Sequence, residues 1–217
     1  MFTGIVEEKG QVISRTPGNG YDELVISCVE VLADLSVGHS IAVNGVCLTA
    51  VKIDNEHFSA QVINETLERS NLSALEAGST VNLERAMGIT DRFHGHIVQG
   101  HVETVGVVTN LHNQAGDVRM SIAVDGFWLR YCIPKGSVTL DGISLTIASM
   151  DETTITVALI PHTLHLTTLG DKQVGDQINI ETDMLARYIE RLFEVESMDE
   201  EFVIDYDKIR GWGYGES

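Results

Sequence analysis

A seven-residue pattern that occurs twice constrains the fold of this chain more than any other feature of its sequence. Residues 43–49 read Val-Asn-Gly-Val-Cys-Leu-Thr, and residues 140–146 read Leu-Asp-Gly-Ile-Ser-Leu-Thr. The order of residue types is the same in both copies, with Asp in place of Asn and Ser in place of Cys. The copies are 97 residues apart. Solenoid units run to only roughly 20–50 residues, so the chain is not a solenoid.

The duplication extends through most of the chain. Further segments recur in the same order at a spacing of 96 or 97 residues: 4–7 with 100–103, 40–41 with 137–138, 65–67 with 162–164, and 78–84 with 175–181. A period of this length is the size of a small domain. We therefore predict two similar domains in tandem, residues 1–96 and 97–186, followed by a C-terminal segment of residues 187–217.

Each domain is predicted to be all-β. The Asn-Gly pair at 44–45 and the Asp-Gly pair at 141–142 are strong turn signals because these residue types tolerate positive φ. Runs typical of short strands surround both pairs, and turn signals recur at intervals of about ten residues. About six strands fit into each repeat, which indicates an antiparallel barrel or sandwich.

The C-terminal segment has a different pattern. Apolar residues fall at helical spacing with charged residues between them: Leu185, Tyr188, Ile189, Leu192 and Phe193. An amphipathic helix that follows two closed domains needs a partner for its apolar stripe, and self-association is the simplest partner. From Ser197 onward we expect a poorly ordered acidic tail.

Composition narrows the classes of function. The chain is 43% hydrophobic and 21% charged, with a net charge of −18. This charge argues against nucleic acid and anionic membranes as partners, because both require clustered Lys and Arg. No run approaches the ~18 apolar residues of a membrane span, and the N-terminus does not read as a signal peptide. Three cysteines without metal-ligand spacing suit a reducing compartment, so we expect a cytoplasmic protein.

The repeated pattern also indicates a pocket in each domain. On a strand, alternation places Cys47 and Thr49 on one face, and Ser144 and Thr146 on the equivalent face of the second domain. A small polar pair beside a tight turn can line a binding site. The plainer interpretation of Cys47, a small buried apolar side chain, is left open, and so is a covalent role.

Several motifs together resemble the riboflavin synthase family over residues 1 to about 193. They are residues 1–6 (Met-Phe-Thr-Gly-Ile-Val), 44–49, 141–146 and 167–170, with the Gly-His pairs at 95–96 and 100–101. The resemblance implies two tandem Greek-key barrels of six antiparallel strands, each binding one 6,7-dimethyl-8-ribityllumazine. It also implies homotrimers formed through a C-terminal amphipathic α-helix, and leaves room for an association with lumazine synthase.

The implied reaction is a dismutation, the last step of riboflavin biosynthesis. One lumazine gives a four-carbon unit to another, which yields riboflavin and 5-amino-6-(ribitylamino)uracil without a cofactor or a metal. In this family the productive site lies between the first barrel of one chain and the second barrel of a neighbouring chain.

The same resemblance supplies the residues that line the pockets. In the first barrel they are Gly4, Ile5, Val6, Cys47, Leu48, Thr49, Gln61, Val62, Ile63, Asn64, Glu65 and Thr66. In the second barrel they are Gly100, His101, Val102, Lys135, Ser144, Leu145, Thr146, Ile160, Pro161, His162, Thr163, Leu164 and His165. His162 and His165 stand where family members carry an acidic residue at one or both positions.

Three side chains are candidates for catalysis: Cys47, Ser40 and His101. Cys47 or Ser40 would supply or deliver the nucleophile, with an activated water as the alternative. His101 occupies the position of Ile5 in the first copy, so a titratable group replaces an apolar one, which suits proton transfer. A structural, hydrogen-bonding histidine is the alternative. Phe2 either stacks on a ligand or anchors the N-terminus.

Two other classes of function remain open at this point. A lumazine or flavin carrier would keep the fold, but such carriers tend to lose the pocket motif in one half, whereas Cys47 and Ser144 are both present here. A purely structural oligomerisation module has no use for paired polar pockets. Turnover of lumazine into riboflavin separates the enzyme from the carrier. A ligand would raise the thermal stability of the enzyme or the carrier, but not that of a structural module.

Overall fold

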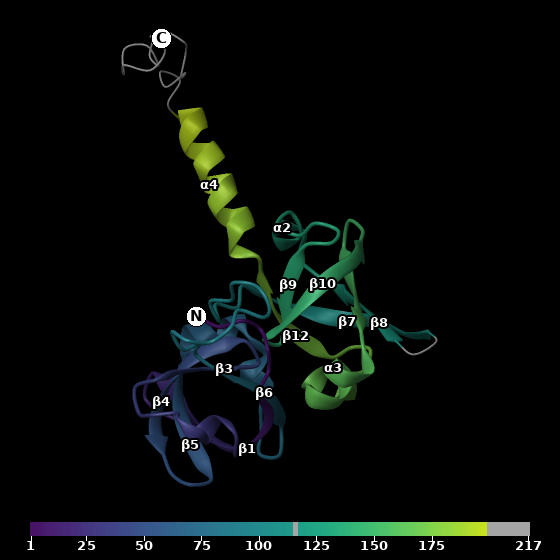
Figure 1. Ribbon diagram of the computed structural model, residues 1–217. Coiled ribbons are helices and arrows are strands. Elements are labelled where there is room, and N and C mark those ends of the chain that lie inside the picture. Colours follow the sequence, from purple (N-terminus) through teal and green to yellow (C-terminus); the bar gives the residue numbers. More distant parts are fainter. Residues whose placement is uncertain (115–116, 199–217) are drawn as a thin grey trace. The chain divides into compact units, whose positions relative to one another are not determined.

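The computed structural model describes residues 1–114 and 117–198. Its strands close into two barrels of six antiparallel strands each, which confirms the predicted fold class and decides for barrels over a sandwich. Figure 1 shows the first barrel in purple and blue and the second in teal and green.

The first barrel has a Greek-key strand order. Its strands are β1 (Glu8–Pro17), β2 (Tyr21–Ser27), β3 (Ser40–Val43), β4 (Val46–Ile53), β5 (His57–Ile63) and β6 (Thr80–Arg85). They neighbour one another in the order β1, β2, β5, β4, β3, β6. Because β2 pairs with β5, the chain passes from β2 to a strand that is not its neighbour, as in a Greek key.

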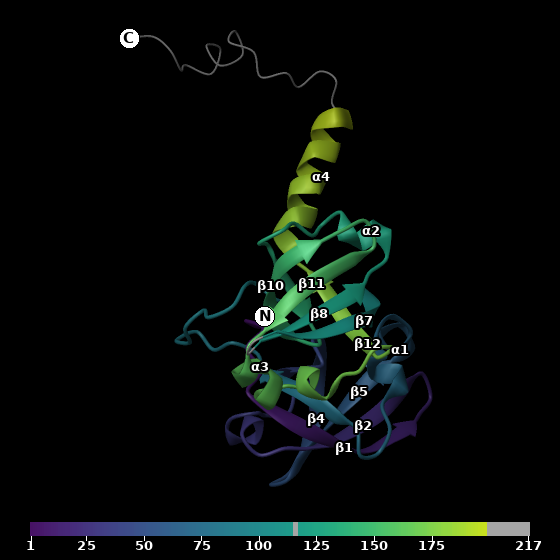
Figure 2. The ribbon, with the colours of Figure 1, turned by 90° about the vertical axis from the view of Figure 1, so that its right-hand side faces the viewer.

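The second barrel repeats this order. Its strands are β7 (Thr104–Gln114), β8 (Asp117–Ala123), β9 (Ser137–Leu140), β10 (Ile143–Met150), β11 (Thr154–Leu159) and β12 (Gln177–Thr182). Figure 2 shows β10, β11, β8 and β7 side by side, which is their hydrogen-bonded order. The topology of the two barrels is therefore the same, as the sequence repeat predicts.

Short helical segments occupy corresponding connections in the two barrels. In the first they are η1 (Val31–Ala33), α1 (Asn64–Arg69) and η2 (Asn71–Ala74), and in the second α2 (Gly126–Leu129), α3 (Pro161–Leu166) and η3 (Thr168–Asp171). The pattern around residues 73–77 predicts a short helix, and the helical turn lies slightly earlier, as η2. The sequence analysis does not predict α3, although Pro161 in its first turn is a common start signal.

Strand alternation builds a separate core in each barrel. In the first barrel Leu24, Ile26 and Phe58 are at most 1% exposed. In the second, Met120 and Ile122 on β8 take the places of Leu24 and Ile26 on β2 and are fully buried. The inward-facing positions are filled by apolar side chains, so the barrel interiors are packed cores and leave the binding of a ligand to their outer surfaces.

The apolar pattern from Phe2 to Ile13 predicts a strand, but the first seven residues do not form part of it. β1 starts at Glu8, and Phe2 forms an isolated antiparallel bridge with Val98, with N···O distances of 2.8 and 3.2 Å. The N–H groups of the next two residues donate to the carboxylate of Glu84. A local pattern cannot signal this arrangement, because that partner is 80 residues further along the chain.

Two asparagines join the barrels through matching hydrogen bonds. The side-chain amide of Asn82 donates to the carbonyl of Asp141 and accepts from the N–H of Thr168, both at 2.9 Å. Asn179, its counterpart in the repeat, makes the equivalent bonds to the first barrel at 2.8 and 2.6 Å. All four bonds are buried, so residues 1–183 form one compact unit with an approximate internal two-fold symmetry.

A second unit begins with the predicted C-terminal helix, α4 (Met184–Met198), drawn in yellow in Figure 1. The apolar side chains of its predicted stripe are 53–67% exposed in the single chain. An acidic tail is expected from Ser197 onward, and its residues after Met198 lie outside the described part of the chain. No helix within residues 1–114 and 117–198 is long and apolar enough to cross a membrane.

Candidate functional site

The polar pairs predicted from the repeat lie on the outer faces of β4 and β10. Leu48 points into the first barrel and is 5% exposed, whereas Cys47 is half-buried and Thr49 is exposed. On β10 Ser144 is half-buried and Thr146 is exposed. The predicted alternation is confirmed, and any pocket that these polar side chains line is therefore outside the barrels.

Pairing between neighbouring strands adds a serine to each face. Ser40 on β3 pairs with Thr49, and Ser137 on β9 pairs with Thr146. Residues paired in an antiparallel sheet present their side chains on the same face, with Cβ atoms about 4.5–5.5 Å apart. Ser40 therefore lies beside Thr49 on the outer face of the first barrel. Ser137 is its counterpart, which the sequence analysis did not single out.

The loop that precedes each barrel contacts the pocket strand of the other barrel. The N–H of Ser144 donates to the carbonyl of Gly4 at 2.7 Å, and the N–H of Cys47 donates to the carbonyl of Gly100 at 2.8 Å. The side chains follow the same exchange. Val6 packs against the core of the second barrel, and residue 102, also a valine, packs against the core of the first.

The resemblance assigned residues 4–6 to the first-barrel pocket and residues 100–102 to the second. In the structure each of these loops touches both barrels. The Gly4 carbonyl and the Val6 side chain contact the second barrel, whereas the Gly4 N–H donates to a glutamate on β6 of the first. The Gly100 carbonyl contacts the first barrel, whereas the His101 N–H donates to a glutamate on β12 of the second. The barrel whose pocket each loop lines therefore stays a prediction.

Both exchanged contacts require glycine. Gly4 has φ of +76° and Gly100 has φ of +80°, in the region that only glycine adopts readily. A Cβ on Gly4 would lie 2.6 Å from the Cβ of Ser144, and one on Gly100 would lie 2.6 Å from the Cβ of Cys47. A side chain at either position would push the loop away from the strand that carries the pocket residue.

A buried glutamate holds each of these loops. Glu84 accepts hydrogen bonds from the N–H of Thr3 at 2.6 Å, the hydroxyl of Thr3 at 2.8 Å and the N–H of Gly4 at 3.0 Å. Glu181 accepts from the N–H groups of the second loop, at 2.7, 2.9 and 2.9 Å. Burial raises the pKa of Glu84 to about 7 and also raises the pKa of Glu181, although these bonds lower both.

Phe2 anchors the N-terminal loop. It is fully buried and packs with Ala42, Val98 and the side chain of Cys47. Its ring lies 2.9 Å from where a Cβ on Gly100 would be, so it fills the space behind the first-barrel loop contact. Of the two roles left open by the sequence, the structure of the single chain supports the anchor.

The three thiols differ in accessibility. Cys28 and Cys132 are buried, and burial raises the pKa of the first to about 12 and of the second to about 11. Neither forms a thiolate readily near neutral pH, so both are inert core residues. Cys47 is half-buried on an outer face, which leaves it as the thiol that a ligand could touch.

Lys135 has a backbone conformation that is uncommon for a residue with a side chain. Its φ is +69°, and its N–H donates to the carbonyl of Ile147 at 2.8 Å. Gly38 stands at the corresponding place in the first barrel, with φ of +92° and the same bond to Ala50 at 2.8 Å. Strain of this kind is concentrated at functional sites. In this conformation Lys135 presents an exposed ammonium group next to β10.

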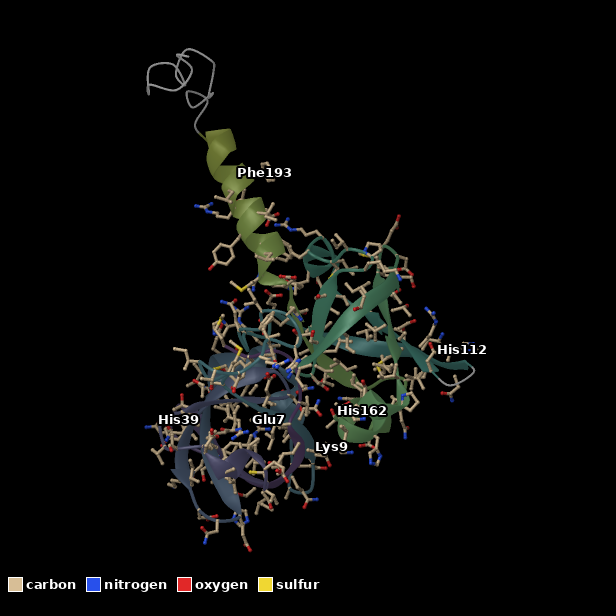
Figure 3. The ribbon with its side chains drawn as sticks, in the orientation of Figure 1. Glu7, Lys9, His39, His112, His162 and Phe193 are labelled. Atoms are coloured by element: carbon tan, nitrogen blue, oxygen red, sulfur yellow. The ribbon has the colours of Figure 1, made fainter. Side chains whose placement is uncertain are left out.

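The remaining predicted pocket residues follow the strands beside β4 and β10. Gln61, Val62 and Ile63 end β5, and Asn64, Glu65 and Thr66 begin α1. Ile160 precedes α3, which contains Pro161, His162, Thr163, Leu164 and His165. The side chains of Val62 and Leu48 are buried in the core, so these two contribute only backbone to an outer pocket. His162 is exposed on α3, as Figure 3 shows.

The larger hollows of the single chain lie beside the polar pairs and do not include them. A groove of about 600 Å³ lies between the barrels, and smaller hollows of about 380 and 330 Å³ lie beside Glu84 and Ser40. His39, labelled in Figure 3, lines the last of these. None of the three is lined by Cys47, Thr49, Ser144 or Thr146.

Comparison with known proteins identifies the family. The lumazine binding domain family matches residues 3–86 and again residues 99–183. The riboflavin synthase of Mycobacterium bovis is 47% identical over 197 residues, which cover 88% of this chain and 98% of that protein. The chain belongs to the riboflavin synthase family. The Bacillus subtilis riboflavin synthase is 41% identical over 191 residues (88% of this chain and 89% of that protein).

Solved structures support the fold. LumP complexed with riboflavin matches with a TM-score of 0.78, and LumP complexed with 6,7-dimethyl-8-(1'-D-ribityl) lumazine with 0.76. Each match has 22% sequence identity and covers 84% of this chain and 99% of LumP. At this identity the likeness extends to the double-barrel fold alone.

Family membership confirms two predictions made from the sequence. The chain is a member of the riboflavin synthase family, whose enzymes are transferases, and it contains two lumazine-binding domains. The individual pocket and catalytic residues stay predictions. The structure adds a contact that the sequence analysis did not single out. The Nδ1 atom of His96 lies 2.7 Å from the Oγ atom of Ser144.

Proposed function

We propose that the protein converts two molecules of 6,7-dimethyl-8-ribityllumazine into riboflavin and 5-amino-6-(ribitylamino)uracil. The observation that carries this proposal is the duplication of one outer-face pocket motif on two barrels of the lumazine-binding family. A reaction between two copies of one substrate needs two sites of similar shape. Holding two reactants in the right geometry can supply roughly 7–11 kcal/mol of a reaction barrier.

The two proposed sites differ in their polar groups. The first combines Cys47, Thr49 and Ser40 with the loop of the other repeat, which contributes His101. The second combines Ser144, Thr146 and Ser137 with the residue 4–6 loop and the ammonium group of Lys135. These groups can bind the ring oxygens and stabilise the anion that forms when an exocyclic methyl group loses its proton.

In the first site three groups are proposed to act on the reacting atoms. Cys47 or Ser40 supplies or delivers the nucleophile that adds to the ring of the donor. His101 moves the proton, since a histidine changes its charge near neutral pH. The exposed positions of Thr49 and His101, and the half-buried position of Cys47, leave these side chains accessible to a ligand.

We infer that productive sites form between chains. In the single chain the polar pairs are on outer faces, whereas a ligand pocket usually buries most of the ligand surface. The apolar stripe of α4 is 53–67% exposed and needs a partner of the same kind. A homotrimer joined through this helix would close the first-barrel site of one chain with the second-barrel site of the next. In this assignment residues 1–96 and 97–186 bind substrate and residues 187–217 join the chains.

Cellular context is part of the same proposal. The substrate is a small soluble molecule, and the predicted reducing environment of the cysteines fits the cytoplasm. A chain that consumes lumazine gains from an association with the enzyme that makes it, lumazine synthase.

A lumazine carrier is the second candidate, because solved structures with the same fold include LumP complexes with lumazine and riboflavin. The purified protein should be mixed with 6,7-dimethyl-8-ribityllumazine while the absorbance of riboflavin is followed. The proposed enzyme releases one riboflavin for every two lumazines consumed and binds two ligands per chain. Stable binding of one ligand per chain without formation of riboflavin would establish the carrier instead.

A further inference from the structure

His96 is buried at the junction of three segments that come from different parts of the chain. Its side chain is 8% exposed, and its backbone N–H donates to the carbonyl of Thr3 at 3.2 Å. Its Nδ1 atom lies 2.7 Å from the Oγ atom of Ser144 on β10. Its Nε2 atom lies 3.3 Å from the Oγ1 atom of Thr139 on β9. Both ring nitrogens therefore have a hydroxyl partner on the second barrel.

The protonation of the ring decides which groups donate. A neutral imidazole donates from one ring nitrogen and accepts at the other, so one of the two hydroxyls donates to the ring and the other accepts from it. We assign the hydroxyl of Ser144 as the donor to Nδ1, and the Nε2–H group as the donor to Thr139. Burial lowers the pKa of His96, while the nearby charge of Asp183 raises it, and the net lowering keeps the ring neutral.

This arrangement fixes how Ser144 meets a ligand. Its hydrogen is committed to His96, and its backbone N–H is committed to the carbonyl of Gly4 at 2.7 Å. The lone pairs of Oγ are then the groups that Ser144 offers outward. An oxygen in this state accepts a hydrogen bond from an N–H or O–H group, and a lumazine carries such donors on its ring and on its ribityl chain.

The first barrel does not reproduce this arrangement. Cys47 takes the place of Ser144 and makes the same backbone bond, to Gly100 at 2.8 Å. The side chain of Phe2, and not a histidine, packs against Cys47. Within residues 1–114 and 117–198, no side-chain hydrogen bond to the Cys47 thiol is recorded. One difference between the two proposed sites is therefore the hydroxyl of Ser144, which has His96 as a partner.

We propose that His96 is a positioning residue that orients the Ser144 hydroxyl as a hydrogen-bond acceptor, so that the second-barrel site binds the lumazine ring system more tightly than the first. This inference rests on the proposed function, since it assumes one ligand site in each barrel. His96 does not need to touch the ligand, because it acts through Ser144.

Calorimetric titration of the full chain with riboflavin, the proposed product, tests this inference without turnover. We expect the wild type to bind two riboflavins per chain with unequal affinities. His96→Ala should weaken the tighter site about three- to tenfold, the contribution of one hydrogen bond, and leave the weaker site unchanged. His96→Asn should restore much of the loss, because its side-chain oxygen can accept the Ser144 hydroxyl at nearly the same place.

A double mutant separates positioning from general stability. If His96 acts only through Ser144, then His96→Ala should add less than about twofold to the effect of Ser144→Ala. A structural defect would instead weaken both sites and would not be restored by His96→Asn. His112→Ala is the matched control, because His112 is exposed on the β7–β8 hairpin, as Figure 3 shows.

The outcomes distinguish this inference from the proposed function. Equal weakening of both sites, no weakening in His96→Ala, or additive effects in the double mutant would each overturn the role of His96 while the enzyme activity stands. If His96→Ala does not fold, the comparison of Ser144→Ala in the wild-type and His96→Asn backgrounds decides in the same way. A wild type that neither binds two riboflavins per chain nor forms riboflavin would instead contradict the proposed function.

Discussion

Glu84 makes the stability of this fold depend on pH in a way that can be calculated. Its carboxylate is 6% exposed and holds the N-terminal loop through Thr3 and Gly4. Burial raises its pKa from the ordinary value of 4.5 to about 7. A folded-state pKa above the unfolded value means that the native chain binds the proton more tightly than the unfolded chain does.

The size and sign of the effect follow from these values. The contribution of Glu84 to the free energy of unfolding is fully present below pH 4.5 and is lost as the pH rises through about 7. At 1.36 kcal/mol for each tenfold change in proton affinity, the loss is about 3 kcal/mol. Glu84→Gln has no carboxyl group to ionise, so its stability does not include this loss. Its amide resembles the protonated acid that the wild type has at low pH. The advantage of the wild type over Glu84→Gln should therefore shrink by about 3 kcal/mol between pH 4.5 and pH 8.

Urea denaturation at a fixed protein concentration, repeated across this pH range, measures the difference. Glu76→Gln is the matched control, because it removes a carboxylate from an exposed position. It should stay close to the wild type throughout. A difference between the wild type and Glu84→Gln that is constant from pH 4.5 to pH 8 would refute the claim that this buried carboxylate ionises at a cost.

Four further predictions concern activity. Cys47→Ser should keep much of the turnover if the thiol is only a pocket wall, whereas intact riboflavin binding with a loss of several orders of magnitude in rate would indicate a covalent role. His101→Ala should lower kcat by about 10²–10⁴ with little change in KM, and an unchanged steady-state rate would remove its role in proton transfer. Deletion of residues 186–217 should yield monomers with little activity, and a fully active monomer by light scattering would contradict a site built between chains. Lys135→Gly should raise stability by about 1 kcal/mol, since it relieves the positive φ that Gly38 adopts freely, and should lower activity; a destabilised variant in thermal melts would show that the backbone is not strained.

The fold class could be predicted because its signals are repeated and local. The Asn-Gly and Asp-Gly turns, the alternation on β4 and β10, and the stripe of α4 each depend on neighbouring residues, and each recurs or extends over several turns. The residue patterns alone left a barrel and a sandwich open, and the family resemblance implied two Greek-key barrels. Short elements were harder to predict from the sequence, because α3 has six residues and η2 has four, too few for a periodic pattern.

The composition of each pocket could not be predicted, because it depends on which barrel a loop packs against. Gly4 and Gly100 occupy equivalent places in the repeat, and alignment alone assigns each to the barrel that follows it in the chain. In the structure the carbonyl of each bonds to the other barrel, at Ser144 and Cys47. His96 is part of a Gly-His motif of the family resemblance, but its contact with Ser144 could not be predicted, because that partner is 48 residues away.

The exchange of loops and the departures from symmetry have one consequence for catalysis. Two identical substrates must take different roles in a dismutation, so two identical surroundings would give neither molecule a reason to be donor or acceptor. Duplication supplied two faces of the same shape, and a few substitutions then made them unequal. Lys135 stands where the first repeat has Gly38, Ser144 has His96 as a partner, and Cys47 bonds to Gly100, the residue before His101. On the proposed assignment, a charge and an oriented hydroxyl meet one substrate and a thiol and an imidazole meet the other, so the two like molecules have unequal surroundings.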